Sequence, residues 1–224
     1  EEVSFSTATD YTGVIEAMAN GQVEAALFGP FSYVLAHKRA NAEAIAAGGD
    51  KETGRLTGYY STIVVLKETG INNIDDLKAK AKEVDFAFVD PASTSGNLVP
   101  RGYLTSKNIN PDKDFRNTIF AGGHDAVAAA LASGKVQAGA IFLPGYEKAV
   151  EKGILDPGKV QIIWKSEEIP HSPWAVRADV DEGLKKKLQQ ALIEVYEKDP
   201  EAMKSIIETF GEEEERWVKV NDSD

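Results

Sequence analysis

Short apolar runs alternate with amphipathic segments along this chain of 224 residues. The runs are rich in β-branched, aromatic or small side chains, which is typical of buried strands. They lie at 23–27, 57–66, 86–89, 136–142, 160–164 and 175–177, with a weaker alternating run at 3–9. The run at 57–66 is polar and aromatic in its first half and apolar in its second, which suits a strand that crosses between two lobes.

Between these runs, apolar residues recur at helical spacing, and Asn, Asp, Gly or Pro mark the boundaries. The predicted helices cover 14–19, 31–39, 73–83, 98–104, 124–133, 146–151 and 181–210. Gly48–Asp50 is predicted as a surface loop, and Glu212–Glu215 as a charged loop or helix end. Because strands and helices alternate, with helix starts after most strands, the pattern predicts an α/β fold with largely parallel sheets.

The stretch that follows the strand at 86–89 contains the first candidate site. Ser93, Thr94 and Ser95 place three hydroxyl groups just before a predicted helix. A helix N-terminus has unpaired N–H groups and partial positive charge, so hydroxyls beside it can form a cradle for an anion without any cation. The alternative is structural: Ser95 caps the helix, and Ser93 and Thr94 fill a turn.

Two further residues of this stretch have expected roles in the backbone. Gly96 would let a ligand approach the main chain closely, since it has no side chain. Pro100 lies about one turn inside the predicted helix, where it should cost a hydrogen bond or bend the helix axis.

A second stretch of similar design lies at 119–134. A short apolar end leads to Gly122 and Gly123, and His124 stands at the start of an alanine-rich helix. His124 can donate to an anion there; the alternative is a capping or loop histidine. Because open α/β sheets bind ligands at the carboxyl ends of their strands, we expect the two helix starts to converge at that edge.

Composition narrows the possible functions. The chain has 25 Lys and Arg against 36 Asp and Glu, a net charge of −11, which argues against a nucleic-acid surface. A small anion held by neutral dipoles needs little net positive charge and stays possible. Cysteine is absent and the three histidines have no metal-ligand spacing, so we expect no disulfide, metal or cofactor. We find no dinucleotide fingerprint, phosphate-binding loop, nucleophile elbow or bilayer-spanning segment.

Five stretches together resemble the substrate-binding proteins of phosphate, phosphite and phosphonate ABC transporters. They are Asp-Tyr-Thr-Gly-Val-Ile-Glu-Ala-Met at 10–18, Phe-Gly-Pro-Phe-Ser-Tyr at 28–33, Tyr-Tyr-Ser at 59–61, Phe-Val-Asp-Pro-Ala-Ser-Thr-Ser-Gly at 88–96 and Gly-Gly-His-Asp-Ala at 122–126. The resemblance implies an α/β, two-lobed type II periplasmic-binding fold, in which a ligand cleft between the lobes closes by hinge motion. It places lobe 1 at 1–65, lobe 2 at 66–164, and the return to lobe 1 with the C-terminal helices at 165–224.

The resemblance also implies which side chains contact a phosphorus oxyanion. Tyr11 would contribute from a loop of the first lobe, and Tyr59 or Tyr60 from the crossing strand, with the register between them open. Hydroxyl and backbone groups of the second lobe and one histidine would complete the set: Ser93, Thr94, Ser95 and His124. Phenol hydroxyls add neutral donors that select an oxyanion without fixed charge.

Three departures from the family pattern affect these expectations. The family usually has a further strand and helix before Val3 and continues beyond Asp224, so we expect the first lobe to lack its N-terminal strand–helix unit. Many members have an aspartate where this chain has Ser172, and a hydroxyl there can donate to the ligand as well as accept. Members that bind aminoalkyl phosphonates place an acid near the cleft, whereas the segment after Phe142 has none until Glu147, which weakens the case for an amine-bearing ligand.

These observations favour the substrate-binding component of an ABC transporter, which passes phosphite, a phosphonate such as methylphosphonate, or phosphate to a membrane permease. The resemblance implies an exported monomer of the periplasm or the outer face of the cell membrane, whose signal segment is not in this chain, and not an enzyme. Two alternatives are an enzyme on the same fold that uses His124 and a sensory binding module. The lack of an acid–base partner or a metal set counts against the enzyme.

Overall fold

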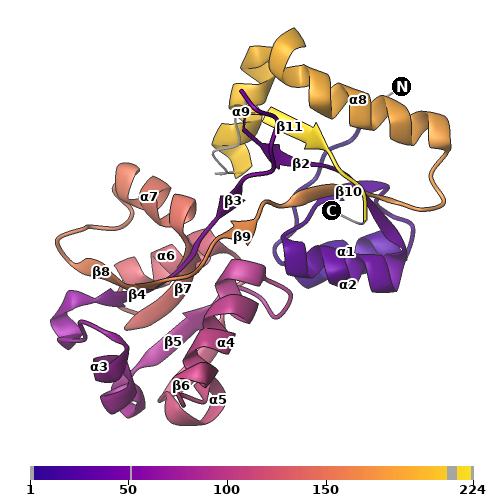
Figure 1. Cartoon of the computed structure of the whole chain (residues 1–224). Coiled ribbons are helices and arrows are strands. Elements are labelled where there is room, and N and C mark those ends of the chain that lie inside the picture. The colour runs from indigo at the N-terminus through magenta and orange to yellow at the C-terminus, as the bar shows by residue number, and fades with distance from the viewer. Residues whose placement is uncertain (1–2, 51, 211–215, 223–224) are drawn as a thin grey trace.

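The computed structural model of the chain describes residues 3–50, 52–210 and 216–222. It consists of two lobes, each built on one β-sheet with helices on both faces, and a narrow waist joins them (Figure 1). Two segments run through the waist, where β3 (Gly58–Tyr59) pairs antiparallel with β9 (Ile169–Pro170). The predicted strand at 57–66 therefore does cross between the lobes, although it is interrupted at Tyr60.

The first lobe contains a four-stranded sheet. Its strands are β1 (Ala25–Leu27), β2 (Ala42–Gly49), β10 (Pro173–Arg177) and β11 (Arg216–Lys219), in the order β1-β10-β2-β11. Its helices are α1 (Tyr11–Ala19) and α2 (Pro30–Ala40) on one face, and α8 (Glu182–Lys198) and α9 (Pro200–Phe210) on the other. Each pair of helices forms its own hydrophobic core against the sheet, around Met18 on one face and around Trp217 on the other.

The second lobe contains a five-stranded sheet. Its strands are β4 (Ser61–Leu66), β5 (Asp85–Phe88), β6 (Asn117–Phe120), β7 (Ala138–Phe142) and β8 (Val160–Lys165), in the order β6-β5-β7-β4-β8. Its helices are α3 (Ile74–Ala79) and α4 (Val99–Ser106) on one face, and α6 (His124–Ala132) and α7 (Leu143–Glu151) on the other. Shorter turns complete the lobe: 3-10 turns at Lys67–Thr69 and Ala81–Glu83, a π turn at Thr94–Leu98, and α5 (Pro111–Asp114).

The prediction of largely parallel sheets is wrong. The strand pairs of the first-lobe sheet are all antiparallel, and in the second lobe only β5–β6 and β5–β7 are parallel. The chain leaves the first lobe along β2 and β3 and returns along β9 and β10, so outgoing and returning strands run in opposite directions. The entry and exit strands of the second lobe, β4 and β8, pair antiparallel for the same reason.

The sequence pattern predicts a surface loop at Gly48–Asp50 and no strand before it, whereas the structure has the strand β2 there, which ends at Gly49. Its sequence is mostly alanine and glycine, which have low strand propensity, so the alternation that marks a strand is absent. Most of β2 is nevertheless buried, and a Cβ on Gly49 would lie 2.7 Å from Val218 Cγ1 on the neighbouring β11. Conversely, residues 3–9, predicted as a weak edge strand, form no strand and are exposed.

Several element boundaries differ from the sequence prediction. Helix α1 begins at Tyr11 and not at the predicted residue 14, because Asp10 caps this helix by accepting from the Gly13 N–H at 2.7 Å. Tyr11 therefore lies in a helix and not on a loop. The predicted charged segment Glu212–Glu215 lies outside the described residues. Within the described ranges, the helices lack the length and the apolar composition that crossing a bilayer requires.

Candidate functional site

The carboxyl ends of β5 and β6 lie side by side, because these strands are parallel neighbours with Phe88 opposite Phe120. Each strand leads into a helix start: the π turn and α4 after β5, and α6 after β6. The side chains at these two starts meet, since Ser95 Oγ lies 3.5 Å from His124 Nε2. The predicted convergence of the two helix starts is confirmed.

The three hydroxyl residues of the π turn have different positions. Ser93 is the N-cap, and its Oγ accepts from the Gly96 N–H at 3.1 Å. The structural alternative that made Ser95 the cap is therefore wrong, and the Ser95 side chain is directed to His124 instead. All three hydroxyl residues are buried, with Thr94 the most accessible at 6%.

Thr94 lies where the two lobes touch. Its Oγ1 accepts from the Phe31 N–H at 2.9 Å, in the first turn of α2 of the first lobe. A Cβ on Gly29, the N-cap of α2, would lie 3.1 Å from the same oxygen, so a larger residue there would push against the Thr94 side chain. The lobes also touch beside Tyr11, because Thr12 Oγ1 lies within 3.4 Å of Asp90 Oδ1 and can donate to it. The hydroxyl turn therefore faces the helix starts of the opposite lobe.

The oxygens of all three hydroxyl groups face nitrogen donors. The oxygens of Ser93 and Thr94 accept from backbone N–H groups, and the oxygen of Ser95 lies nearest to the Nε2 of His124. In the part of the chain that the structure describes, the Ser93 and Thr94 hydroxyls donate to no protein acceptor, and the Ser95 hydroxyl donates to none when the Nε2 of His124 carries the ring proton. Each O–H group therefore remains available as a donor, which suits a ligand that only accepts.

His124 is held as a neutral donor. Its Nδ1 lies 3.3 Å from the Phe142 backbone nitrogen, which can only donate, so the neutral ring carries its proton on Nε2. Burial among protein atoms lowers the pKa of His124 to about 3, although the residue as a whole is half-buried. An Nε2–H aimed at Ser95 cannot remove a proton from that hydroxyl. The geometry therefore favours an anion donor over the catalytic base of the enzyme alternative.

The two tyrosines of the crossing strand point to opposite sides. The Tyr59 ring is buried and packs edge-on against Phe142, with ring centres 6.3 Å apart, and the Phe142 ring lies 4.5 Å from that of His124. The Tyr60 ring instead has Lys165 Nζ 3.6 Å from its centre. Since side chains alternate along an extended segment, the structure brings Tyr59 towards the histidine and turns Tyr60 away.

Two predicted residues come from other parts of the waist and the first lobe. Tyr11 packs against hydrophobic cores of both lobes, so it lies at their junction. Ser172 lies between β9 and β10 on the returning segment and is 4% exposed.

The expected roles of Gly96 and Pro100 change in the structure. A Cβ on Gly96 would lie 2.2 Å from Val89 Cγ2 and 2.8 Å from Ser93 Oγ. The glycine is therefore required because the turn packs against the end of the β5 segment, and not because a ligand approaches the backbone there. Pro100 lies in the first turn of α4, where proline is tolerated, because the π turn delays the α-helix until Val99.

Three groups that position these side chains are not among the residues predicted from the sequence. Two are backbone N–H groups, those of Phe31 and Phe142, and a backbone group has no signal of its own in a sequence. The third is Ser61, whose Oγ donates to the Ser95 carbonyl at 2.6 Å in a buried environment. Here a signal exists, because Ser61 and Thr62 are hydroxyl residues at the start of an otherwise apolar strand.

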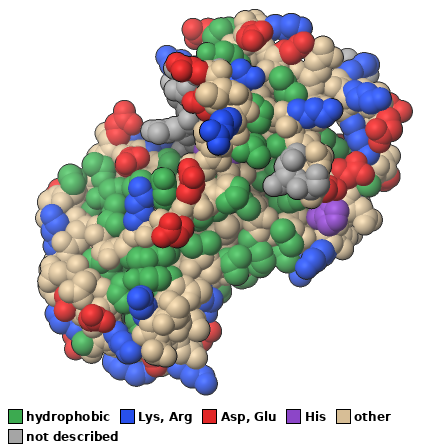
Figure 2. Space-filling model, in the orientation of Figure 1, with side chains coloured by type: hydrophobic (Ala, Val, Ile, Leu, Met, Phe, Trp, Pro, Cys, Tyr) green, Lys and Arg blue, Asp and Glu red, His purple; other side chains and the backbone are tan. Residues whose placement is uncertain are grey.

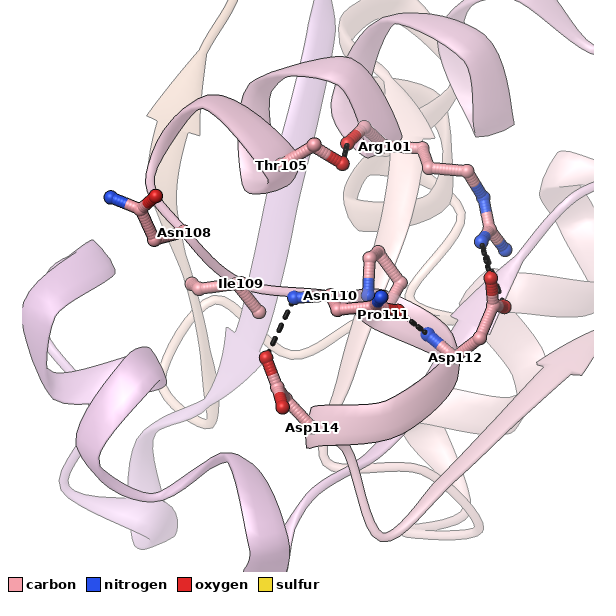
Figure 3. Close-up of a pocket in the computed structure, with 8 residues that line it drawn as sticks. All are labelled: Arg101, Thr105, Asn108, Ile109, Asn110, Pro111, Asp112 and Asp114. Atoms are coloured by element: carbon pink, nitrogen blue, oxygen red, sulfur yellow. Dashed lines mark hydrogen bonds and ion pairs between the residues drawn. The ribbon is translucent and has the colours of Figure 1, made fainter.

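Two surface hollows lie elsewhere on the second lobe, and their cationic groups already have partners. Figure 3 shows a cavity of about 390 Å³ in which Arg101 forms a bidentate pair with Asp112 at 2.8 Å. Its lining residues are Arg101, Thr105, Asn108, Ile109, Asn110, Pro111, Asp112 and Asp114. A second hollow of about 670 Å³ contains Lys80 and Lys82, whose ammonium groups bond to backbone carbonyls. On the face in Figure 2, acidic and basic side chains are interspersed over both lobes.

Comparison with known proteins gives consistent matches. A family model described as "ABC transporter, phosphonate, periplasmic substrate-binding protein" matches residues 1–224. The phosphonates-binding periplasmic protein of Escherichia coli K12 is 35% identical over 208 residues, which cover 91% of this chain and 59% of that protein. The phosphate-import protein PhnD of Mycolicibacterium smegmatis is 37% identical over 182 residues, which cover 78% of this chain and 56% of that protein. The chain thus spans less than two thirds of the length of these two relatives.

A solved structure has the same architecture. The crystal structure of a binding protein component of an ABC phosphonate transporter from Pseudomonas aeruginosa matches with a TM-score of 0.85 and 28% identity. The match covers 96% of this chain and 70% of that one. The two-lobed α/β fold predicted from the sequence is confirmed. All three relatives are named for binding or import, and none of the three as an enzyme.

Proposed function

This chain belongs to the family of periplasmic substrate-binding proteins of phosphonate ABC transporters and has the type II periplasmic-binding fold, and we propose that it captures a small phosphorus oxyanion between its lobes. The proposal covers phosphite, methylphosphonate or another small phosphonate, and phosphate. The relatives support this range, since one is named for phosphonates and another for phosphate import.

The observation that carries the proposal is a group of buried and half-buried donors without positive charge. The hydroxyls of Thr94 and Ser95 and the Nε2–H of His124 lie at two adjacent helix starts of the second lobe. Neutral donors and helix N-termini stabilise an oxyanion and leave no buried cation when the site is empty. A phosphorus oxyanion offers two or three acceptor oxygens, which suits such a set.

The first lobe would close over the anion. Tyr11, at the start of α1, and the start of α2, which already bonds to Thr94, lie at the junction of the lobes. Tyr59 would add a phenol donor from the waist, on the side of His124, and Ser172 would add a hydroxyl from the returning segment. Closure around a ligand by hinge motion would then present both lobes to the membrane permease of an ABC transporter, on the periplasmic or outer face of the membrane.

Calorimetric titration tests this function directly. The chain would be titrated with phosphite, methylphosphonate, phosphate, sulfate and 2-aminoethylphosphonate under identical conditions. We expect one phosphorus anion to bind most tightly and sulfate to give no heat. We expect 2-aminoethylphosphonate to bind more weakly, because the segment after Phe142 lacks an acid for its amine. Folded protein that binds none of the phosphorus anions, or binds sulfate equally well, would contradict the proposal.

A further inference from the structure

The carbonyl groups of the hydroxyl turn need donors, and one of them cannot obtain its donor from the turn itself. The Ser93 carbonyl accepts from the Leu98 N–H, and the Thr94 carbonyl from the Val99 N–H, both five residues ahead. In the same register the Ser95 carbonyl would accept from residue 100. That residue is a proline, which has no N–H.

Ser61 supplies the missing donor. It is fully buried at the start of β4, and its Oγ donates to the Ser95 carbonyl at 2.6 Å. A buried carbonyl without a partner destabilises the structure around it, so this side-chain bond replaces the backbone bond that Pro100 removes. The conformation of the turn therefore depends on a side chain from another strand.

Ser61 also joins the two segments of the waist. Its N–H donates to Ser166 Oγ at 2.9 Å, and its carbonyl accepts from the Ser166 N–H at 2.9 Å. Ser166 begins the segment that returns to the first lobe. Across the sheet, Ser61 stands opposite Phe142, whose N–H is bonded to His124. Ser61, which belongs to the outgoing segment, thus contacts the returning segment, the hydroxyl turn, and the strand position that holds the histidine.

We propose that Ser61 is a positioning residue for the anion site: it fixes the hydroxyl turn and couples that turn to the two crossing segments. The inference rests on the proposed function, since it assigns to Ser61 a role in capturing the same oxyanion. Ser61 itself does not contact the anion in this account. It holds the Ser95 backbone, so that the hydroxyls of Thr94 and Ser95 point to one ligand.

The test compares two hydroxyl deletions on adjacent residues of one strand. Ser61→Ala removes the bond to the turn, and Thr62→Val removes an equally buried bond, from Thr62 Oγ1 to the Ile141 carbonyl at 2.7 Å, which lies within the sheet. We expect similar losses of unfolding midpoint from both. We expect only Ser61→Ala to weaken anion binding, by about ten-fold, with a faster dissociation rate. Equal affinity of the two variants would overturn the inference.

A rescue experiment sharpens the assignment. Pro100→Ala restores an N–H in register with the Ser95 carbonyl, so it should recover part of the affinity lost in Ser61→Ala and change little in the unaltered protein. Failure to recover any affinity, with both double and single variants folded, would contradict the role given to the pair.

A second measurement needs no ligand. Amide hydrogen exchange should speed up at residues 94–99 in Ser61→Ala and stay unchanged there in Thr62→Val. If the unaltered chain binds no phosphorus anion, the proposed function fails, and this exchange pattern alone decides the role of Ser61 in the turn. Unchanged exchange in Ser61→Ala would overturn that role.

Discussion

Two polar clusters adjoin α4, one in the turn before its start and one that joins Arg101 and Thr105 of the helix to the segment at 108–114, and they differ in how their hydrogen bonds are used. Before α4, the hydroxyls of the turn accept from N–H groups and keep their own protons available. The cavity of Figure 3 has more charge, but the guanidinium of Arg101 is bound to Asp112, and the Asp114 carboxylate accepts from the Asn110 N–H at 2.7 Å.

The difference shows that the number of polar groups is a poor guide to a binding site. In the Arg101 cavity, Arg101 is paired with Asp112 and the Asp114 carboxylate is bonded to a backbone N–H, so an entering ion would have to break an existing bond. In the hydroxyl turn, the bonds that fix the side chains leave donors unused. Unused donors of one kind, held rigidly, define the chemistry of a ligand better than paired charges do.

The largest loss of stability and of anion binding should come from filling the space beside the hydroxyl turn. Gly96→Ala would place a Cβ 2.2 Å from Val89 Cγ2, and overpacking of this kind costs about 1–3 kcal/mol of unfolding free energy. We expect the turn to shift and anion binding to be lost, as measured by urea unfolding and calorimetry. Gly102→Ala is the matched control: a Cβ there meets nothing within 4 Å, so this helical position should tolerate alanine. Equal stability of the two variants would contradict the packing account.

The next largest effect should come from removing the Nε2 donor of His124 while the acceptor for the Phe142 N–H is kept. His124→Asn keeps an acceptor for the Phe142 N–H and removes the Nε2 donor, whereas His124→Gln can keep a donor near the Nε2 position. We expect the asparagine variant to lose roughly 1.5–3 kcal/mol of binding, about ten- to a hundred-fold in affinity, with little change in unfolding midpoint. The glutamine variant should bind more tightly than the asparagine variant. The reverse order in titration would show that the ligand does not use the Nε2 proton.

A smaller effect concerns the pH dependence of stability. The folded-state pKa of His124, about 3, lies below its ordinary 6.5, so the unfolded chain takes up a proton first as the pH falls. The stability associated with the neutral ring is complete above pH 6.5 and decreases as the pH falls from there towards 3. Urea unfolding of the ligand-free protein at several pH values should show that its unfolding free energy falls more steeply with decreasing pH than that of His124→Asn. Parallel pH profiles would mean that the folded protein does not hold the ring neutral.

The smallest effect should come from the other cluster. Asp112→Asn weakens the pair with Arg101, but the Asp112 side chain is 69% exposed, and exposed pairs contribute about 1 kcal/mol or less. We therefore expect little change in unfolding free energy and none in anion affinity. A clear fall in affinity would place the Arg101 cavity within the functional site and break the contrast between the clusters.

Much of the site could be predicted because its residues are local in sequence. Ser93, Thr94 and Ser95 follow a strand and precede a helix, and His124 stands at the next helix start. Adjacent strand ends then suffice to bring Ser95 and His124 together, and the structure does so. The crossing role of the segment at 57–66 was also visible, as a change from polar to apolar residues.

The remainder depends on contacts that are distant in sequence. The donors that fix the side chains are backbone groups of Phe31 and Phe142, and their places follow only from the paths of α2 and β7. The choice of Tyr59 over Tyr60 depends on a strand break that propensity does not reveal. The direction of the strands follows from the crossings between lobes. The strand β2 was not predicted because its alanine and glycine residues pack closely but have low strand propensity.

The central claim is that an anion is held by neutral donors, and the protonation of His124 tests it most directly. A proton–nitrogen correlation spectrum of the imidazole rings at pH 7, with His124→Asn for assignment, would be recorded without ligand and with the anion that binds most tightly. The account predicts a neutral ring with its proton on Nε2 in the ligand-free protein, and a shift of the Nε2 signal on binding. Any of three results would contradict it: a cationic ring at pH 7, a proton on Nδ1, or an Nε2 signal that stays unchanged when the anion is added.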